Sequence, residues 1–123
     1  MTYFAQANRQ QKDLYIKKTL STQHSTTPWI PKENIKISAI DMTVFTAPAG
    51  SGSTTIRVYK DRTLSSEATL FDGVFSAGET SESTATNYSQ TIVAGSRITY
   101  SIIAEATGSP GVDCLISFTY ENI

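Results

Sequence analysis

Apolar and polar side chains alternate along most of the chain with the period of two that is typical of β-strands. The stretch 54–61 places Ile56 and Val58 on one face and Arg57 and Tyr59 on the other. Two later stretches show the same alternation, with Ile98, Tyr100, Ile102 and Ala104 on one face of the first and Cys114, Ile116, Phe118 and Tyr120 on one face of the second.

The first long strand-like stretch changes the phase of its alternation part-way along. Ile35 and Ile37 lie in one phase, whereas Ile40 and Met42 continue in the other, so the slip falls at Ser38–Ala39. A single extra residue in one strand of an antiparallel pair changes the phase in this way. The pattern therefore predicts one continuous strand with a β-bulge, rather than two separate strands.

Weaker, polar strands are predicted at 67–71 and 80–87, linked by residues 72–79. Ser and Thr account for 33 of the 123 residues, which suits a protein rich in strands and turns. In total the pattern gives seven or eight short strands and no convincing helix. We predict an all-β fold, an antiparallel β-sandwich that is jelly-roll-like or Ig-like, with strand connectivity left open.

Residues 1–31 differ from the rest and predict an extended N-terminal arm ahead of a β-sandwich domain at 32–123. The first thirty residues contain no glycine and little continuous apolar sequence. Pro28 and Pro31 flank Trp29, and prolines at this spacing exclude a helix and favour an extended connection.

A short apolar stretch inside the predicted arm, residues 13–21, is compatible with two local structures. Leu14 and Ile16 would share one face of a strand, with Tyr15 on the other. Asp13 could instead cap a short helix. We favour the strand.

Charge is distributed unevenly, although the formal net charge is only −1. Residues 1–36 carry six basic and two acidic side chains, whereas residues 37–123 carry four basic and nine acidic side chains. We expect the basic segment to dock on an acidic surface of the same chain or of a neighbouring copy, with a solvated basic tail as the alternative. The low net charge argues against a nucleic-acid partner.

Few residues suggest catalysis or a bound cofactor. The one cysteine, Cys114, lies in an apolar strand and is expected to be a buried structural thiol. The one histidine, His24, lies in a polar run and is expected to be solvated or at an interface. Glu79 and Glu82 lack the apolar surroundings that raise the pKa of a glycosidase acid. We expect no catalytic residue, no metal and no cofactor.

The sequence contains no apolar stretch long enough to span a membrane and no signal-peptide core at its N-terminus. We therefore expect a protein that is made and used without Sec export and has no membrane partner.

Five short elements follow one another in an order and spacing that together are moderately specific. They are TAPAG at 46–50, IRVYKD at 56–61, SAGE at 76–79, AGSRITYSI at 94–102 and CLISFTY at 114–120. Through them the last ninety residues resemble small, jelly-roll-like β-sandwich structural proteins of tailed-phage virions, of the head decoration (cement) or fibre type. Ser96 departs from the acidic residue usual there, residues 51–53 lengthen the first turn, and the arm is not covered.

This resemblance implies a non-enzymatic virion protein, made in the cytoplasm of a host bacterium, that binds the major capsid protein or other virion proteins. Such proteins commonly form homotrimers. We expect the arm to staple neighbouring subunits by adding a strand to their sheets, and a sandwich lacking residues 1–30 to fold without decorating particles. The residues expected to contact partners are Tyr3, Phe4, Leu14, Tyr15, Ile16, Lys17, Lys18, Trp29 and Ile30.

The alternative is a tail- or head-fibre module that binds host-surface glycan. Its site would lie in the loops near 47–53, 72–79 and 107–112, with Tyr59 and Tyr88 as exposed stacking platforms. For Trp29, which lies between Pro28 and Pro31, we favour burial in a neighbouring protein over sugar binding.

Overall fold

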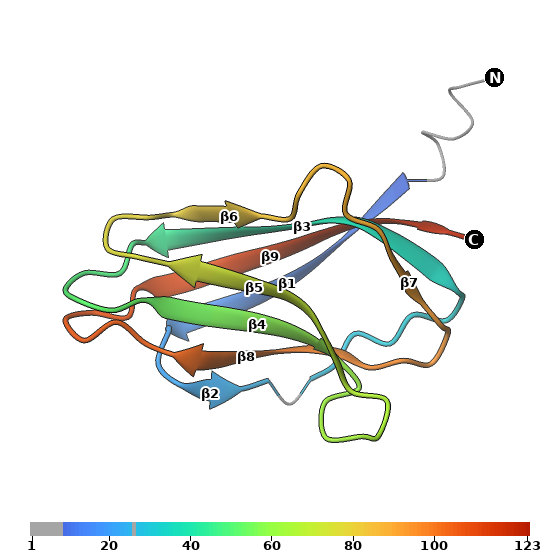
Figure 1. The fold of residues 1–123 in the computed structure, drawn as a ribbon, viewed down its shortest axis with the longest axis horizontal. Coiled ribbons are helices and arrows are strands. Elements are labelled where there is room, and N and C mark those ends of the chain that lie inside the picture. Colours follow the sequence, from blue (N-terminus) through green and yellow to red (C-terminus); the bar gives the residue numbers. More distant parts are fainter. Residues whose placement is uncertain (1–8, 26) are drawn as a thin grey trace.

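The computed structural model describes residues 9–25 and 27–123, and in these ranges the chain consists of strands and connections without a helix (Figure 1). The predicted antiparallel β-sandwich is confirmed. Its strands are β1 (Arg9–Thr19), β2 (Gln23–His24), β3 (Ile35–Thr46), β4 (Thr54–Lys60), β5 (Ala68–Phe75), β6 (Ser81–Ser83), β7 (Gln90–Ile92), β8 (Ile98–Ala104) and β9 (Val112–Asn122).

The strands pair in a nested order, from the ends of the chain inward. β1 pairs with β9, β2 with β8, β3 with β6 and β7, and β4 with β5, all antiparallel. Further pairing of β9 with β3 and of β8 with β4 rolls this ladder into two sheets, ordered β1-β9-β3-β6 and β2-β8-β4-β5. Because β6 and β7 pair with opposite ends of β3, they act as one interrupted strand. The connectivity is that of a jelly roll rather than an Ig fold.

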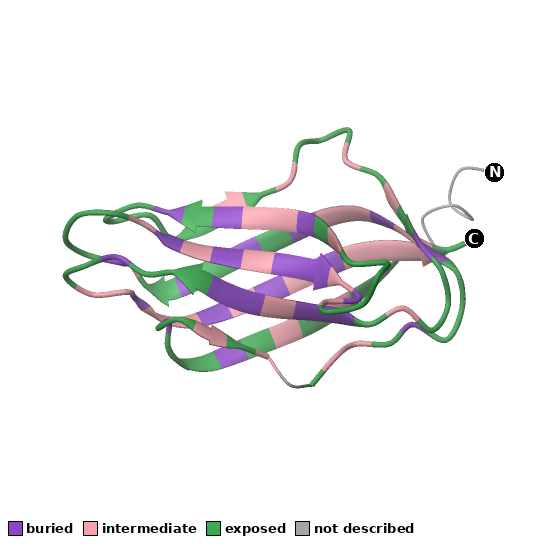
Figure 2. Cartoon of the chain, turned by 60° about the horizontal axis from the view of Figure 1, so that its bottom comes forward, coloured by how far each residue is buried: buried purple, intermediate pink, exposed green. Residues whose placement is uncertain are grey.

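The bulge predicted in the first long strand is present in β3. Its pairing with β9 shifts register between Ile37 and Ala39, so Ser38 is the extra residue. As a result Ile37 and Ile40, on either side of the slip, are both fully buried. Figure 2 shows the alternation of buried and exposed positions along the strands.

The boundary expected at residue 31 does not separate an arm from a sandwich. Residues 9–19 form β1, which pairs with β9 along its length, starting with Arg9 opposite Glu121. Ile16 and Leu20 are 1% and 0% exposed and belong to the same core as the later strands. The physical reason is that β1 pairs with the edge of β9 that β3 leaves free. The polar residues on the outer face of β1 hid from the sequence pattern that its inner face contributes to the core.

Strand β5 extends beyond its predicted end, through residues expected to form a link. Gly73 makes this continuation feasible, because a Cβ atom there would lie 2.4 Å from the Met42 Sδ of the opposite sheet. The space that glycine leaves is filled by Met42, and Phe75 completes the strand with a fully buried ring. Sequence patterning ended the strand early because it treats glycine as a turn residue.

A buried threonine ties the start of β4 to the loop before β9. The Thr54 side chain is fully buried, and its hydroxyl donates to the Pro110 carbonyl at 2.8 Å. The same oxygen accepts a hydrogen bond from the Ala106 N–H at 3.1 Å. One hydroxyl therefore satisfies two backbone groups where the chain is neither helix nor strand.

Candidate assembly surface

The outer edge of β1 is the longest free strand edge among the described strands. β1 also carries several of the predicted partner residues. β1 occupies the end of its sheet, and its eleven residues pair with β9 on one side. No other strand in the described part of the chain pairs with its second side. An edge strand of this kind presents unpaired backbone N–H and C=O groups, which a strand from another molecule can engage.

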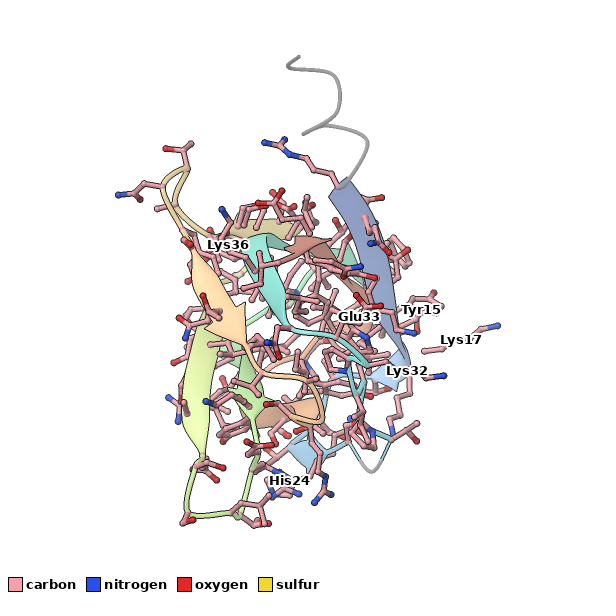
Figure 3. All side chains as sticks on the ribbon, turned by 90° about the vertical axis from the view of Figure 1, so that its right-hand side faces the viewer. Tyr15, Lys17, His24, Lys32, Glu33 and Lys36 are labelled. Atoms are coloured by element: carbon pink, nitrogen blue, oxygen red, sulfur yellow. The ribbon has the colours of Figure 1, made fainter. Side chains whose placement is uncertain are left out.

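The outer face beside this edge carries exposed aromatic side chains. Tyr15 on β1 is 46% exposed and Phe45 on β3 is 56% exposed. Their rings meet edge to face with centroids 5.8 Å apart, across the intervening strand β9. Tyr15 points away from the body of the sandwich (Figure 3). Desolvation and then the Asp113 carboxylate raise the pKa of Tyr15 above its usual value.

The same strand carries most of the positive charge of the N-terminal segment. Arg9, Lys12, Lys17 and Lys18 lie on β1 with one acidic residue, Asp13. Both Lys17 and Lys18 are exposed, and Lys17 projects from the strand into solvent (Figure 3). Lysines along an edge disfavour pairing with an identical edge, because like charges would face each other. The edge therefore suits an acidic partner better than a second copy of itself.

Two of the expected partner residues on β1 lie on its inner face instead. Ile16 is buried in the core, and Leu14 packs against the core from a partly buried position. The alternation that put them on one face was read correctly, but that face packs into the core between the two sheets of the same chain. The expectation that Ile16 contacts a partner is wrong for this physical reason.

Trp29 anchors within its own chain, contrary to the expectation that it anchors in a neighbour. Its N–H and C=O exchange hydrogen bonds with the backbone of Ile98, both at 2.8 Å. Its ring packs on Phe118 and Tyr120, with centroid distances of 5.2 and 5.1 Å. Trp29 thus bridges β8 of one sheet and β9 of the other.

A shallow pocket of about 300 Å³ lies next to Trp29. Ile30, one of the expected partner residues, lines it and is 48% exposed. The aromatic ring of Tyr120 forms part of the wall, and Lys32 and Glu33 provide charged groups at the rim. An aromatic wall with polar groups around it is a shape that suits a sugar ring or an apolar side chain.

His24 forms a hydrogen bond with a serine, but the pair lacks the properties of a nucleophilic site. Its Nδ1 lies 2.7 Å from the Ser101 Oγ across the β2–β8 pair. Ser101 is fully buried, so a substrate has no access to its oxygen. Within residues 9–25 and 27–123 no group of three or more His, Cys, Asp or Glu side chains converges to hold a metal. No helix in that same part of the chain could cross a membrane.

The loops expected to bind glycan pack closely against one another. Ala49 and Ser109 exchange two backbone hydrogen bonds, and a Cβ atom on Gly50 would lie 2.5 Å from the Gly108 nitrogen. The small residues of the first turn therefore serve loop packing. The two tyrosines expected to be exposed beside these loops are not: Tyr59 is 9% exposed, and Tyr88 packs on the core with its hydroxyl on the Leu70 carbonyl.

The structure thus brings together Tyr15, Lys17 and Lys18 at one strand edge and places Ile30 near a separate pocket. Tyr3 and Phe4 lie outside the described residues. Sequence reasoning missed Phe45, although an aromatic residue in the polar phase of a strand is the signal that could have identified it.

No protein-family model matches this chain, and no curated protein matches its sequence. Among solved structures, the chain is similar to one from work on Bacillus endospore appendages, described as a novel family of disulfide-linked pili. The TM-score is 0.45 and the sequence identity is 12%, over 93% of this chain and 85% of the other. These comparisons assign the chain to no family.

Proposed function

We propose that this chain is a non-enzymatic structural protein of a tailed-phage virion, a capsid decoration protein that binds neighbouring virion subunits through the free edge of β1. The observation that carries the proposal is this edge. β1 is eleven residues long, and no described strand pairs with its outer side. The resemblance of five sequence elements to those of decoration and fibre proteins supports the virion setting.

The attachment is mechanical and differs from a detachable arm. β1 is fixed by its own core contacts, so the sandwich presents a preorganised edge rather than a flexible segment. A preorganised edge loses less conformational entropy on binding than a free tail does. Backbone hydrogen bonds along the edge, burial of the Tyr15–Phe45 face, and attraction of the β1 lysines to an acidic subunit surface then add up over a symmetric lattice.

Immunogold electron microscopy tests the virion placement. Antibodies raised against the purified chain are applied to tailed-phage particles from cultures of the bacterium that carries its gene. We expect gold on the heads at many positions per particle. Particles that carry no gold anywhere would refute the placement, and gold confined to fibre tips would favour the alternative below.

Charge reversal tests the role of the β1 edge. Lys17→Glu on the exposed side of β1 is expected to weaken binding to particles by about tenfold, the equivalent of roughly 1.4 kcal/mol. Lys60→Glu is the matched control, because it makes the same charge change on β4 of the other sheet. Equal occupancy of particles by wild type and Lys17→Glu, measured by co-sedimentation, would count against this edge.

A fibre module that binds host-surface glycan is the second candidate, and the pocket beside Trp29 and Tyr120 favours it. A glycan array probed with the labelled protein tests this candidate. A specific signal that Tyr120→Ala abolishes and Tyr15→Ala leaves intact would establish a glycan site at this pocket. An array without signal would remove this candidate and leave the decoration role.

A further inference from the structure

A second pocket is lined by two arginines. It has a volume of about 250 Å³ and is lined by residues of the loop after β4, the start of β8 and the segment after β2. The residues that line it are Ser25, Pro28, Arg62, Thr63, Arg97 and Thr99. The lining therefore carries two positive charges and no negative one.

Neither guanidinium is neutralised by an ion pair. The two ion pairs within the described ranges join Lys36 to Glu121 and Arg57 to Asp72, so Arg62 and Arg97 pair with no described carboxylate. Arginine offers a planar set of donors that matches phosphate and carboxylate oxygens, and it is used wherever such groups are recognised.

A buried hydroxyl lines the same pocket without a hydrogen-bond partner. Thr99 is 6% exposed, and its Oγ1 has no partner among the described residues. Buried hydroxyls are almost always hydrogen-bonded, because leaving one unpaired costs stability. The Oγ1 atom itself is shielded from solvent, so a small anion in the pocket would accept from it only after the Thr99 side chain rotates toward the pocket.

The loop that carries Arg62 is held in place by its own hydrogen bonds. Asp61 donates its N–H to the Arg97 carbonyl at 2.8 Å, and its Oδ1 accepts the Arg97 N–H at 2.9 Å. Thr63 has a φ of 73° and donates its N–H to the Glu67 carboxylate at 2.7 Å. Both Asp61 oxygens already accept hydrogen bonds, from the Arg97 N–H and from the Ser66 hydroxyl, and the carboxylate attracts the Arg97 guanidinium only from beyond ion-pair distance.

We propose that this pocket binds a phosphate group, with Arg62 and Arg97 as its charge partners and Thr99 as a hydrogen-bond donor. The volume accommodates a phosphate with a few waters, and it is small for a whole drug-sized ligand. The ligand is therefore either free inorganic phosphate or the phosphate monoester end of a larger molecule whose remainder lies outside the pocket.

Titration followed by amide chemical shifts tests the proposal on the full chain at low ionic strength. Inorganic phosphate is expected to shift the amide signals of Thr63, Arg97 and Thr99 in a saturable way, with a dissociation constant in roughly the millimolar range. Arg97→Gln, which keeps the backbone link to Asp61, is expected to weaken binding by about tenfold or more. Arg9→Gln is the matched control at the far end of β1 and should leave the affinity unchanged.

Thr99→Val provides a second variant whose folding is secure, since it replaces an unpaired hydroxyl with a methyl of the same shape. It should weaken phosphate binding by a few-fold while its midpoint of urea unfolding is equal to or above that of wild type. Absence of saturable shifts with wild type, or equal weakening by Arg9→Gln and Arg97→Gln, would overturn the site. A parallel titration with glycerol phosphate assigns the source: tighter binding than inorganic phosphate supports a monoester end group, and weaker binding supports the free anion.

Discussion

Replacing Ile16 by alanine distinguishes a strand that belongs to the sandwich from an arm that can leave it. Ile16 is 1% exposed and packs in the core formed by both sheets. The change removes three carbon atoms, or roughly 2.4 kcal/mol of transfer free energy at ~0.8 kcal/mol per carbon. The cavity left behind raises the expected loss of unfolding free energy to about 2–5 kcal/mol.

Urea denaturation followed by tryptophan fluorescence measures this loss, because Trp29 bridges the two sheets and reports on their separation. With a slope of about 2 kcal/mol per molar urea, the midpoint should fall by roughly 1–2.5 M. Lys17→Ala, the exposed neighbour on the same strand, should change the unfolding free energy by less than about 0.5 kcal/mol.

An unchanged midpoint for Ile16→Ala would refute the reasoning, since it would mean that β1 separates from a sandwich that is stable without it. The corresponding truncation should agree with the point variant. Removing residues 1–30 takes away β1, Leu20 and Trp29 together, so we expect a chain that no longer unfolds cooperatively. This outcome is the opposite of the one that the sequence alone suggested.

Three further predictions concern other parts of the fold. Thr54→Val should lower the unfolding free energy by about 2–4 kcal/mol, because it leaves two buried backbone groups unpaired. Thr54→Ser keeps the hydroxyl, so in the same urea assay it should lower the unfolding free energy by about half as much or less. Burial raises the pKa of the Cys114 thiol to about 12, so a thiol reagent at neutral pH should label the native protein far more slowly than the protein in guanidinium; equal rates would contradict a closed core. The Arg97 N–H and then the Ser66 hydroxyl hold the pKa of Asp61 below 3.8, so the unfolded chain binds more protons in this range and the unfolding free energy should fall as the pH drops from about 4 through the folded-state pKa. Asp61→Asn should flatten that fall in acid titrations of the urea midpoint, and an unaltered slope would speak against it.

The strand pattern could be predicted where apolar side chains on a strand face a single core. The bulge in β3 was readable because Ile37 and Ile40 are both buried, and a phase slip is the only way for one strand to bury both. The end of β5 could not be predicted, because Gly73 continues the strand by pairing with Ile56 of β4, and its lack of a side chain is explained by Met42 of the other sheet. The residues around Gly73 do not indicate a contact with Met42, which lies far away in the sequence.

The candidate surface was predicted in part for a similar reason. The period of two separated Tyr15 from Ile16 correctly, but periodicity does not say which molecule covers the apolar face. The role of Trp29 depended on the position of β9. Arg62 and Arg97 line the same pocket because the turn at Asp61 is hydrogen-bonded to Arg97. Each is a tertiary contact between segments far apart in the chain.

The pairing of the first strand with the last has a consequence for biosynthesis. β9 lies between β1 and β3, so the central strand of this sheet is the last of the nine to leave the ribosome. Until β9 has been synthesised, β1 and β3 lack the strand with which both pair, and their apolar faces stay exposed to solvent. Folding of such a topology is expected to be slow and to be completed only after β9 has been synthesised, with the incomplete sheet as the species most prone to aggregate. The lysines of β1 then have a second use, since they keep that waiting edge in solution before β9 arrives.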